Sequence, residues 1–171
     1  MNETRHCDFS EDRVYRYALR IRWSEHLPLV QFIGLNPSTA DETKDDPTIR
    51  RCRNFAKAWG MGGMVMTNLF AFRATQPGDM KRAKEPIGET GKTWITTGNA
   101  EFSNRNDFFL YSTAIACPVR IAAWGTHGSF LYRAAKVKQF MPQMQCIRVT
   151  SGGFPEHPLY LPATLTPIAL P

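Results

Sequence analysis

Cysteine is scarce in this sequence, and long hydrophobic runs are missing from it. The 171 residues include 4 cysteines, which lie far apart and form no Cys-x-x-Cys pair. This spacing argues against a zinc site and against the disulfide framework of a small secreted domain. No segment approaches the roughly 18 consecutive apolar residues of a transmembrane helix, and residues 1–12 lack the apolar core of a signal peptide. We therefore expect a cytoplasmic protein with no membrane partner.

Patterns for metal and cofactor binding are also incomplete. The acidic segment 41–46 lacks the ordered ligand spacing of a calcium-binding loop, so no metal site is expected. Residues 88–93 (GETGKT) resemble the end of a phosphate-binding P-loop. However, Pro86 stands where that motif needs its first glycine, and no strand precedes the segment. The sequence therefore predicts no cofactor.

Positive charge, in contrast, is in excess. The chain has 21 Lys+Arg against 15 Asp+Glu, a formal net charge of +6, and a pI near 9.4. Such a surface attracts polyanions, which favours a DNA or RNA partner. The composition, 43% hydrophobic and 21% charged, is that of an ordered globular protein. The length fits one domain over residues 1–171.

Apolar runs alternate with helical patterns along the chain. The expected buried strands are residues 29–35, 64–70, 119–124 and 145–150. An alternating segment, 14–23, predicts an antiparallel strand that forms a hairpin with the first of them. The expected helices are residues 47–59 with Asp46 as N-cap, 79–84, 107–117 and 128–141. Residues 86–104 are polar and contain three glycines, so they predict a long flexible loop, and residues 151–171 predict an irregular tail.

This order of elements predicts an α/β fold of three layers, α/β/α. Its central sheet would be mostly parallel and four-stranded, with the N-terminal antiparallel strand at its edge. Ligands of such sheets bind beyond the carboxyl ends of the strands. The segments expected at that edge are residues 34–46, 68–77, 124–128 and 151–162.

Polar residues in these segments are candidates for a site, although each also has a structural explanation. Asn36 follows a buried strand, where it either caps backbone groups in a tight turn or faces a ligand. Asn68 is either a buried amide satisfied by its neighbours or a reader of a pyrimidine edge. His157 lies in a loop rich in glycine and proline, where it either forms a structural hydrogen bond or donates to a substrate oxygen.

Taken together, these segments resemble the uracil-DNA glycosylase superfamily, particularly its mismatch-specific thymine/uracil branch and its single-strand-selective branch. The matching motifs, in the expected order, are Gly34-Leu35-Asn36-Pro37, Thr67-Asn68-Leu69-Phe70 with Arg73-Ala74-Thr75-Gln76-Pro77, and His157-Pro158-Leu159. The chain also resembles an uncharacterised family of small bacterial and phage proteins, a domain of unknown function. The runs shared with that family are residues 35–41, 46–52, 68–71, 123–125 and 157–161.

The glycosylase resemblance implies a role for each matching residue. Asn36 would orient the attacking water, and His157 would hydrogen-bond the base oxygen as negative charge develops on it. Asn68, with Gly34 and Leu35, would bind the base edge, and Phe55, or an aromatic residue near it, would stack on the flipped base. Leu159 and Tyr160 would fill the gap left in the DNA. The implied phosphate contacts are Arg50, Arg51 and Arg73.

The implied function is hydrolysis of the glycosidic bond of a flipped uracil or modified pyrimidine. The expected partner is DNA, duplex or single-stranded, and the expected state is a monomer. Two departures from the glycosylase pattern matter: Ser38 stands where a glycine is common, and Leu159-Tyr160 replaces a Ser-Pro pair. Two other functions remain open, a non-catalytic module that binds nucleic acid or protein, and an enzyme acting on free nucleosides or nucleotides.

Overall fold

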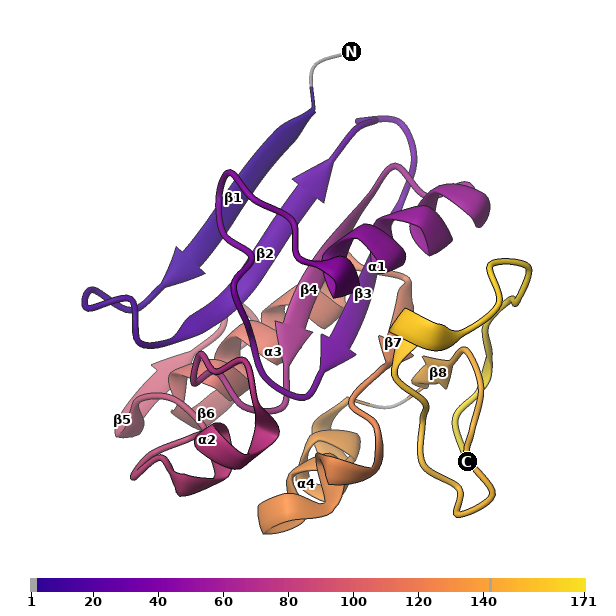
Figure 1. Ribbon diagram of the computed structural model, residues 1–171. Helices are drawn as coiled ribbons and strands as arrows, with labels where there is room; N and C mark the ends of the chain where they lie inside the picture. Colours follow the sequence, from indigo (N-terminus) through magenta and orange to yellow (C-terminus); the bar gives the residue numbers. More distant parts are fainter. Residues whose placement is uncertain (1–2, 142) are drawn as a thin grey trace.

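The protein has a mixed α/β fold built on one large sheet, as seen in a computed structural model that describes residues 3–141 and 143–171 (Figure 1). The sheet has seven strands in the order β1-β2-β4-β3-β7-β8-β9, and β5 and β6 form a separate hairpin. The strands are β1 (Thr4–Phe9), β2 (Arg16–Arg22), β3 (Leu29–Gly34), β4 (Gly63–Asn68), β5 (Thr90–Ile95), β6 (Glu101–Asn104), β7 (Val119–Ala122), β8 (Gln145–Cys146) and β9 (Ile168–Ala169). The helices are α1 (Pro47–Ala58), α2 (Pro77–Arg82), α3 (Arg105–Ala116), α4 (Arg133–Phe140) and two 3-10 segments, η1 (Thr126–Tyr132) and η2 (Pro158–Tyr160).

The centre of the sheet is parallel and its two sides are antiparallel. Strand β3 pairs in parallel with both β4 and β7, and β7 pairs in parallel with β8. Strands β2 and β9 join this centre in antiparallel pairing with β4 and β8. The mixed α/β class expected from the sequence is confirmed, but the sheet is larger than the four strands and one edge strand that were expected.

The expected hairpin between residues 14–23 and 29–35 is wrong. Strand β2 pairs with β4, so that Leu19 lies opposite Met66, and β3 lies on the far side of β4. Strand β2 is not an edge strand either, because β1 covers it from Thr4 to Phe9. Long-range packing decides this order: all six residues of β4 are buried, as expected for a strand in the middle of the sheet, between β2 and β3.

Residues 86–104, expected as a flexible loop, instead contain the β5–β6 hairpin. Aromatic residues of both strands pack on helix α3: Trp94 lies beside Phe108, and Phe102 lies 5.3 Å from Tyr111 between ring centroids. These contacts give a polar, glycine-containing segment a surface to fold against. The segment 151–171 likewise contains an ordered turn, η2, and the short strand β9.

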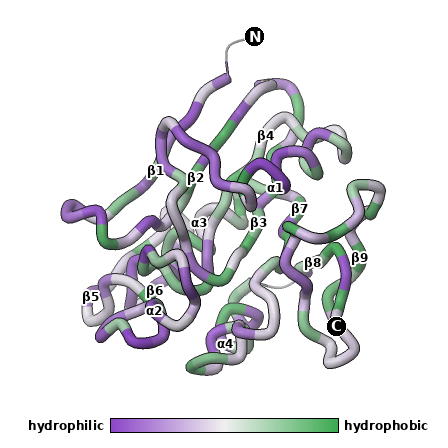
Figure 2. The backbone as a smooth tube through the Cα atoms, in the orientation of Figure 1, coloured by the Kyte–Doolittle hydropathy of each residue, from purple (hydrophilic) through white to green (hydrophobic). Residues whose placement is uncertain are grey.

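Helices cover both faces of the sheet. Alternate residues of β3 divide between the faces: Val30 and Phe32 pack with Ile49 and Phe55 of α1, and Ile33 packs with residues of α3 and α4. Figure 2 shows the hydrophobic residues concentrated in the central strands, whereas β1 and the α2 region are mostly hydrophilic. The core therefore lies on the two faces of β3 and β4.

Helix α1 begins as the sequence predicts. Asp46 is its N-cap and accepts a hydrogen bond from the backbone N–H of Ile49 at 2.9 Å, with Pro47 in the first turn. The predicted helix 128–141 starts differently, because the 3-10 segment η1 precedes α4 and the backbone of Leu131 and Tyr132 is left-handed. The 4 cysteines are buried and reduced. In residues 3–141 and 143–171, no helix is both long and apolar enough to cross a membrane.

A buried ion pair joins α3 to α4. Arg133 is 1% exposed, and its Nη2 donates to Asp107 Oδ1 at 2.6 Å, while its Nε donates to the backbone oxygen of Leu69 at 2.9 Å. Asn106, also fully buried, donates through Nδ2 to the backbone oxygens of Asn68 and Leu69 at 3.0 Å. Both helices therefore hold the chain where β4 ends.

The substitution Asp107→Ala should be strongly destabilising, because it leaves the Arg133 guanidinium buried without its carboxylate. We expect a loss of about 3–5 kcal/mol in the free energy of unfolding, measured by urea titration. The matched control is Glu156→Ala, which breaks the exposed pair with Arg148 and should cost at most about 1 kcal/mol. Equal losses in the two variants would contradict a structural role for the Arg133–Asp107 pair.

Candidate functional site

A cavity of about 500 Å³ lies at the carboxyl ends of the parallel strands. This is the edge of the sheet at which parallel α/β proteins bind ligands, and the volume suits a small organic molecule. Its walls come from the ends of β3, β4 and β7, the start of α1, the start of η1 and the turn before η2. The lining residues used below are Arg16, Gly34, Leu35, Asn36, Asp46, Thr48, Asn68, Trp124, His127, His157 and Leu159. Most of the candidates from the sequence, namely Gly34, Leu35, Asn36, Asn68, His157 and Leu159, therefore meet in one cavity.

Gly34 and Asn68 lie side by side where β3 and β4 end. They are direct partners in the parallel register, and both line the cavity. A Cβ on Gly34 would lie 2.7 Å from Asn68 Oδ1, so the glycine makes room for the amide. Asn68 is 1% exposed, yet neither its Oδ1 nor its Nδ2 has a hydrogen-bond partner in the part of the chain that the structure describes. An unpaired buried amide costs about 1–3 kcal/mol, which a ligand in this cavity would recover.

Asn36 is half-buried in the loop that follows β3. Its Nδ2 donates to the backbone oxygens of Ala74 at 2.7 Å and Pro37 at 3.1 Å. Its Oδ1 accepts no hydrogen bond from the described residues, so the carbonyl end of the amide is free for a water or a ligand. Both explanations of Asn36 therefore apply: its Nδ2 caps backbone groups, and its Oδ1 is available to a ligand.

His157 presents a hydrogen-bond donor to the cavity. Burial lowers the pKa of the imidazole below its ordinary value, although the nearby Asp46 carboxylate opposes the shift, and this favours the neutral ring. The backbone N–H of Leu159 donates to Nδ1 at 3.3 Å, which makes Nδ1 the acceptor. The proton of the neutral ring is therefore on Nε2, the nitrogen left for a ligand.

The aromatic side chain on the cavity wall is Trp124, not Phe55. Trp124 follows β7 and lines the cavity, and its ring is packed so closely that a Cβ on Gly128 would lie 2.2 Å from Cδ1. Phe55 is buried in the core instead, 5.3 Å from Trp59 between ring centroids, because it lies on the stripe of α1 that faces the sheet. The prediction that Phe55 itself stacks on a base is therefore wrong.

Two charged residues of the cavity were missed as ligand-facing groups. Arg16 begins β2, lines the cavity and is only 1% exposed, although an arginine in an alternating strand is usually solvated. Asp46 was predicted only as a helix cap, yet its carboxylate also lines the cavity. Hydrophobic periodicity could not have predicted that either residue lines the cavity, because the cavity forms only when segments far apart in the sequence come together.

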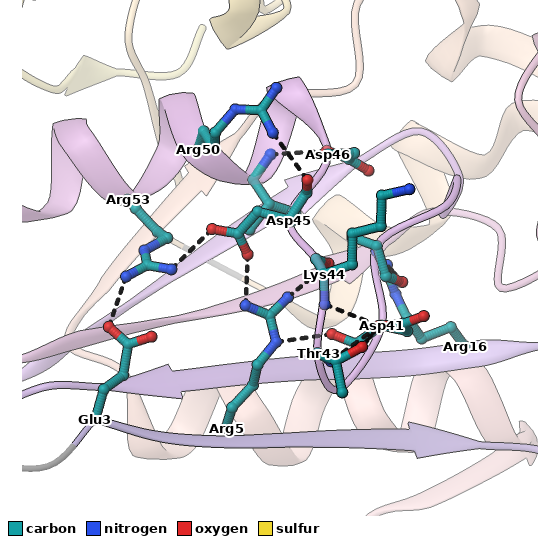
Figure 3. A network of polar contacts seen from close by, with 12 residues as sticks. Glu3, Arg5, Arg16, Asp41, Thr43, Lys44, Asp45, Asp46, Arg50 and Arg53 are labelled. Atoms are coloured by element: carbon teal, nitrogen blue, oxygen red, sulfur yellow. Dashed lines mark hydrogen bonds and ion pairs between the residues drawn. The ribbon is translucent and has the colours of Figure 1, made fainter.

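A network of arginines fixes the loop that carries Asp46 (Figure 3). Arg5 of β1 donates to Asp45 at 2.5 Å and to the backbone oxygens of Asp41 and Lys44, and Arg53 of α1 donates to Asp45 at 2.7 Å. These contacts come from both sides of the loop. The acidic segment 41–46 is therefore held in place by arginines from β1 and α1.

The remaining candidates lie around the cavity and do not line it. Arg73 borders a neighbouring hollow of about 510 Å³, which shares Ser38 and Thr39 with the cavity. Arg50 is exposed on α1, and Tyr160 is 87% exposed on η2. Arg51 lies over the Phe55 ring and donates to the backbone oxygen of Leu161, so it ties η2 to α1. No group of three His, Cys, Asp or Glu side chains is arranged to hold a metal among residues 3–141 and 143–171.

The substitution Asp45→Ala tests the clamp on this loop. Burial works against ionisation of Asp45, but hydrogen bonds from Arg5 and Arg53 hold its pKa below its ordinary value. A lowered pKa stabilises the fold above the unfolded value of about 4, and this stabilisation is lost as the pH falls through the folded value. We expect the variant to lose about 1–3 kcal/mol of unfolding free energy at pH 7, and the difference from wild type to shrink below about pH 4.

The control for this measurement is Glu11→Ala, which removes an exposed carboxylate. It should leave the free energy of unfolding unchanged at both pH values. A difference between Asp45→Ala and wild type that does not depend on pH would show that the ionised carboxylate is not what holds the loop.

Comparison with known proteins identifies a family without an assigned activity. Residues 16–159 match the family described as "Protein of unknown function (DUF1643)". No curated protein and no solved structure matches the chain. The matched segment covers most of the chain and includes every residue of the cavity discussed above. The chain belongs to the DUF1643 family.

Proposed function

We propose that the protein hydrolyses the N-glycosidic bond of a pyrimidine nucleotide flipped out of DNA. The observation that carries this proposal is the buried amide of Asn68, unpaired at both ends in a cavity that also contains Asn36 and His157. An amide has an acceptor and two donors, which complement the imide or amide edge of a pyrimidine. An amide satisfied only by ligand also rejects molecules that lack such an edge.

The side chains around Asn68 suit the other requirements of this reaction. Trp124 offers an aromatic surface for the base, in the role that the glycosylase resemblance implied for Phe55. The Nε2–H of His157 donates to a base oxygen as negative charge moves onto the departing base. Leu159 lies at the cavity and Tyr160 is exposed beside it, so η2 is the segment to occupy the space that the base leaves in DNA.

The bond changes require a water and a proton acceptor. The free Oδ1 of Asn36 orients the water, whose oxygen bonds to the anomeric carbon while the glycosidic bond breaks and its electron pair leaves with the base. An amide is a poor base, so the proton of the water goes to a carboxylate. Asp46 is the carboxylate on the cavity wall, and it supplies this acceptor.

The first test is release of a base from DNA. Duplex and single-stranded oligonucleotides that carry uracil or modified pyrimidines are incubated with the protein, and abasic sites are measured by alkaline cleavage. We expect release from at least one substrate, and a loss of about 100-fold or more in Asn36→Ala and in Asn68→Ala, with DNA binding retained. The matched control is Asn54→Ala, an exposed amide on α1, which should keep full activity. If no base is released while DNA binding stays tight, the protein is a binding module.

A second test concerns the phosphate contacts. Arg73 borders the hollow beside the cavity, and its guanidinium donates to the backbone oxygen of Arg13, which leaves its charge uncompensated. We expect Arg73→Ala to weaken DNA binding and to reduce the slope of log K against log salt by about 1. Arg120→Ala is the control, because Arg120 lies at the opposite end of the parallel strands. Wild-type binding that does not respond to salt would contradict a nucleic-acid function altogether.

A further inference from the structure

Arg16 is a buried cation on the cavity wall. It is 1% exposed, and its Nη1 donates to the backbone oxygen of Ala40 at 2.6 Å. Its Nε has no hydrogen-bond partner in the described parts of the chain. The side chain is therefore anchored to the loop after β3 by one nitrogen, with further donor capacity left at the cavity.

No carboxylate forms an ion pair with Arg16 among the described residues, in contrast to Arg133, the other fully buried arginine. Burial lowers the pKa of Arg16 to about 10, while the Cys7 thiol and Asp46 oppose the shift, so the guanidinium stays charged at neutral pH. A buried charge without a counter-ion is costly, and the cost is largest in the absence of a ligand. Asp46 lines the same cavity and favours the charged form of Arg16, but the two side chains form no ion pair.

The start of helix α1 adds to the positive potential. Pro47, Thr48 and Ile49, the first residues of this helix of 12 residues, line the same cavity as Arg16. The amino end of a helix carries a partial positive charge, and anions bind there when donors converge on it. The Asp46 cap occupies the N–H of Ile49, so Arg16 is the main donor to an anion at this position.

We infer that this part of the cavity is an anion subsite, in which Arg16 binds a phosphate or carboxylate group of the ligand. The inference rests on the proposed function in two respects only. It takes the same cavity as the site, and it takes a pyrimidine as the part of the ligand that Asn68 binds. An anionic oxygen group would pair with the charge of Arg16 and accept hydrogen bonds from its unsatisfied donors. The ligand is therefore a pyrimidine compound with a negative charge, not a neutral base or nucleoside.

Binding of defined probes to the full chain tests this inference by isothermal titration calorimetry. The probes are deoxyuridine, its 5′-monophosphate, a pyrimidine base that carries a carboxylate, and a short uracil-containing DNA strand. We expect at least one anionic probe to bind about 10- to 100-fold more tightly than deoxyuridine, since a hydrogen bond to a charged group strengthens binding by about this factor. The probe that binds best tells whether the charge belongs to a phosphomonoester, a base substituent or the DNA backbone.

Variants of Arg16 separate a ligand-binding role from a structural one. In Arg16→Met, binding of the anionic probe should fall to that of deoxyuridine, while the melting temperature of the free protein stays unchanged or rises. Arg16→Lys, which keeps the charge with fewer donors, should lose part of the affinity. The control is Arg120→Met, which also removes an arginine that donates to a backbone oxygen, but away from the cavity.

The inference is overturned if wild type binds deoxyuridine as tightly as every anionic probe, or if Arg16→Met keeps the preference. If Arg16→Met does not fold, the comparison of probes on wild type and on Arg16→Lys decides. The result for the anion subsite can be distinguished from the result for the proposed glycosylase activity. Anion binding without base release supports the subsite and contradicts the glycosylase, whereas base release that Arg16→Met leaves unchanged does the reverse.

Discussion

The parallel pairing of β3 with β4 is the constraint on which the site depends. Its register places Gly34 opposite Asn68, and only a residue without a Cβ leaves space for the Asn68 amide. Because the two strands are parallel, the loops that follow them begin at the same edge of the sheet. The loop after β3 carries Asn36 and Asp46, and the loop after β4 carries Arg73. Helices α3 and α4 then hold the end of β4 through Asn106 and Arg133, so the floor of the cavity is fixed from the far face of the sheet.

Buried polar atoms without a hydrogen-bond partner occur both away from the cavity and at it. Away from the cavity, Arg133 has its carboxylate, whereas the Oε1 of Gln31 and the Oδ1 of Asn106 are buried acceptors without a partner among the described residues. At the cavity, both ends of Asn68 and the Nε of Arg16 have no partner among the described residues. Each such group lowers the stability of the free protein, but those at the cavity lie where a ligand can satisfy them. Stability and binding are thus opposed in these residues.

Local signals in the sequence predicted much of the fold and part of the site. The buried runs of β3, β4 and β7 and the Asp46 cap of α1 were predictable, because apolar periodicity and capping act over a few residues. The partner of β2 and the β5–β6 hairpin were not, since each is decided by packing against residues far along the chain. The same limit explains why Phe55 was misplaced and Arg16 was missed. The position of Phe55 on its helix did not show whether it faces the core or the cavity, and an arginine in an alternating strand resembles a solvated residue.

The arginines of the chain differ in how far their charges are compensated. Arg5, Arg13, Arg20, Arg53, Arg105, Arg133 and Arg148 form ion pairs with carboxylates, so their charges are largely compensated. The hydrogen-bond acceptors of Arg16, Arg50, Arg51 and Arg73 are backbone oxygens, which orient a guanidinium without neutralising it. Arg22 and Arg120 do the same at the opposite end of the sheet, and of these six arginines only Arg16 lines the cavity in which the buried amide of Asn68 also lacks a partner. In Arg16 and Asn68, uncompensated charge and unsatisfied hydrogen bonding therefore coincide at the carboxyl edge of β3 and β4, and this combination favours a polar, negatively charged ligand over a neutral one.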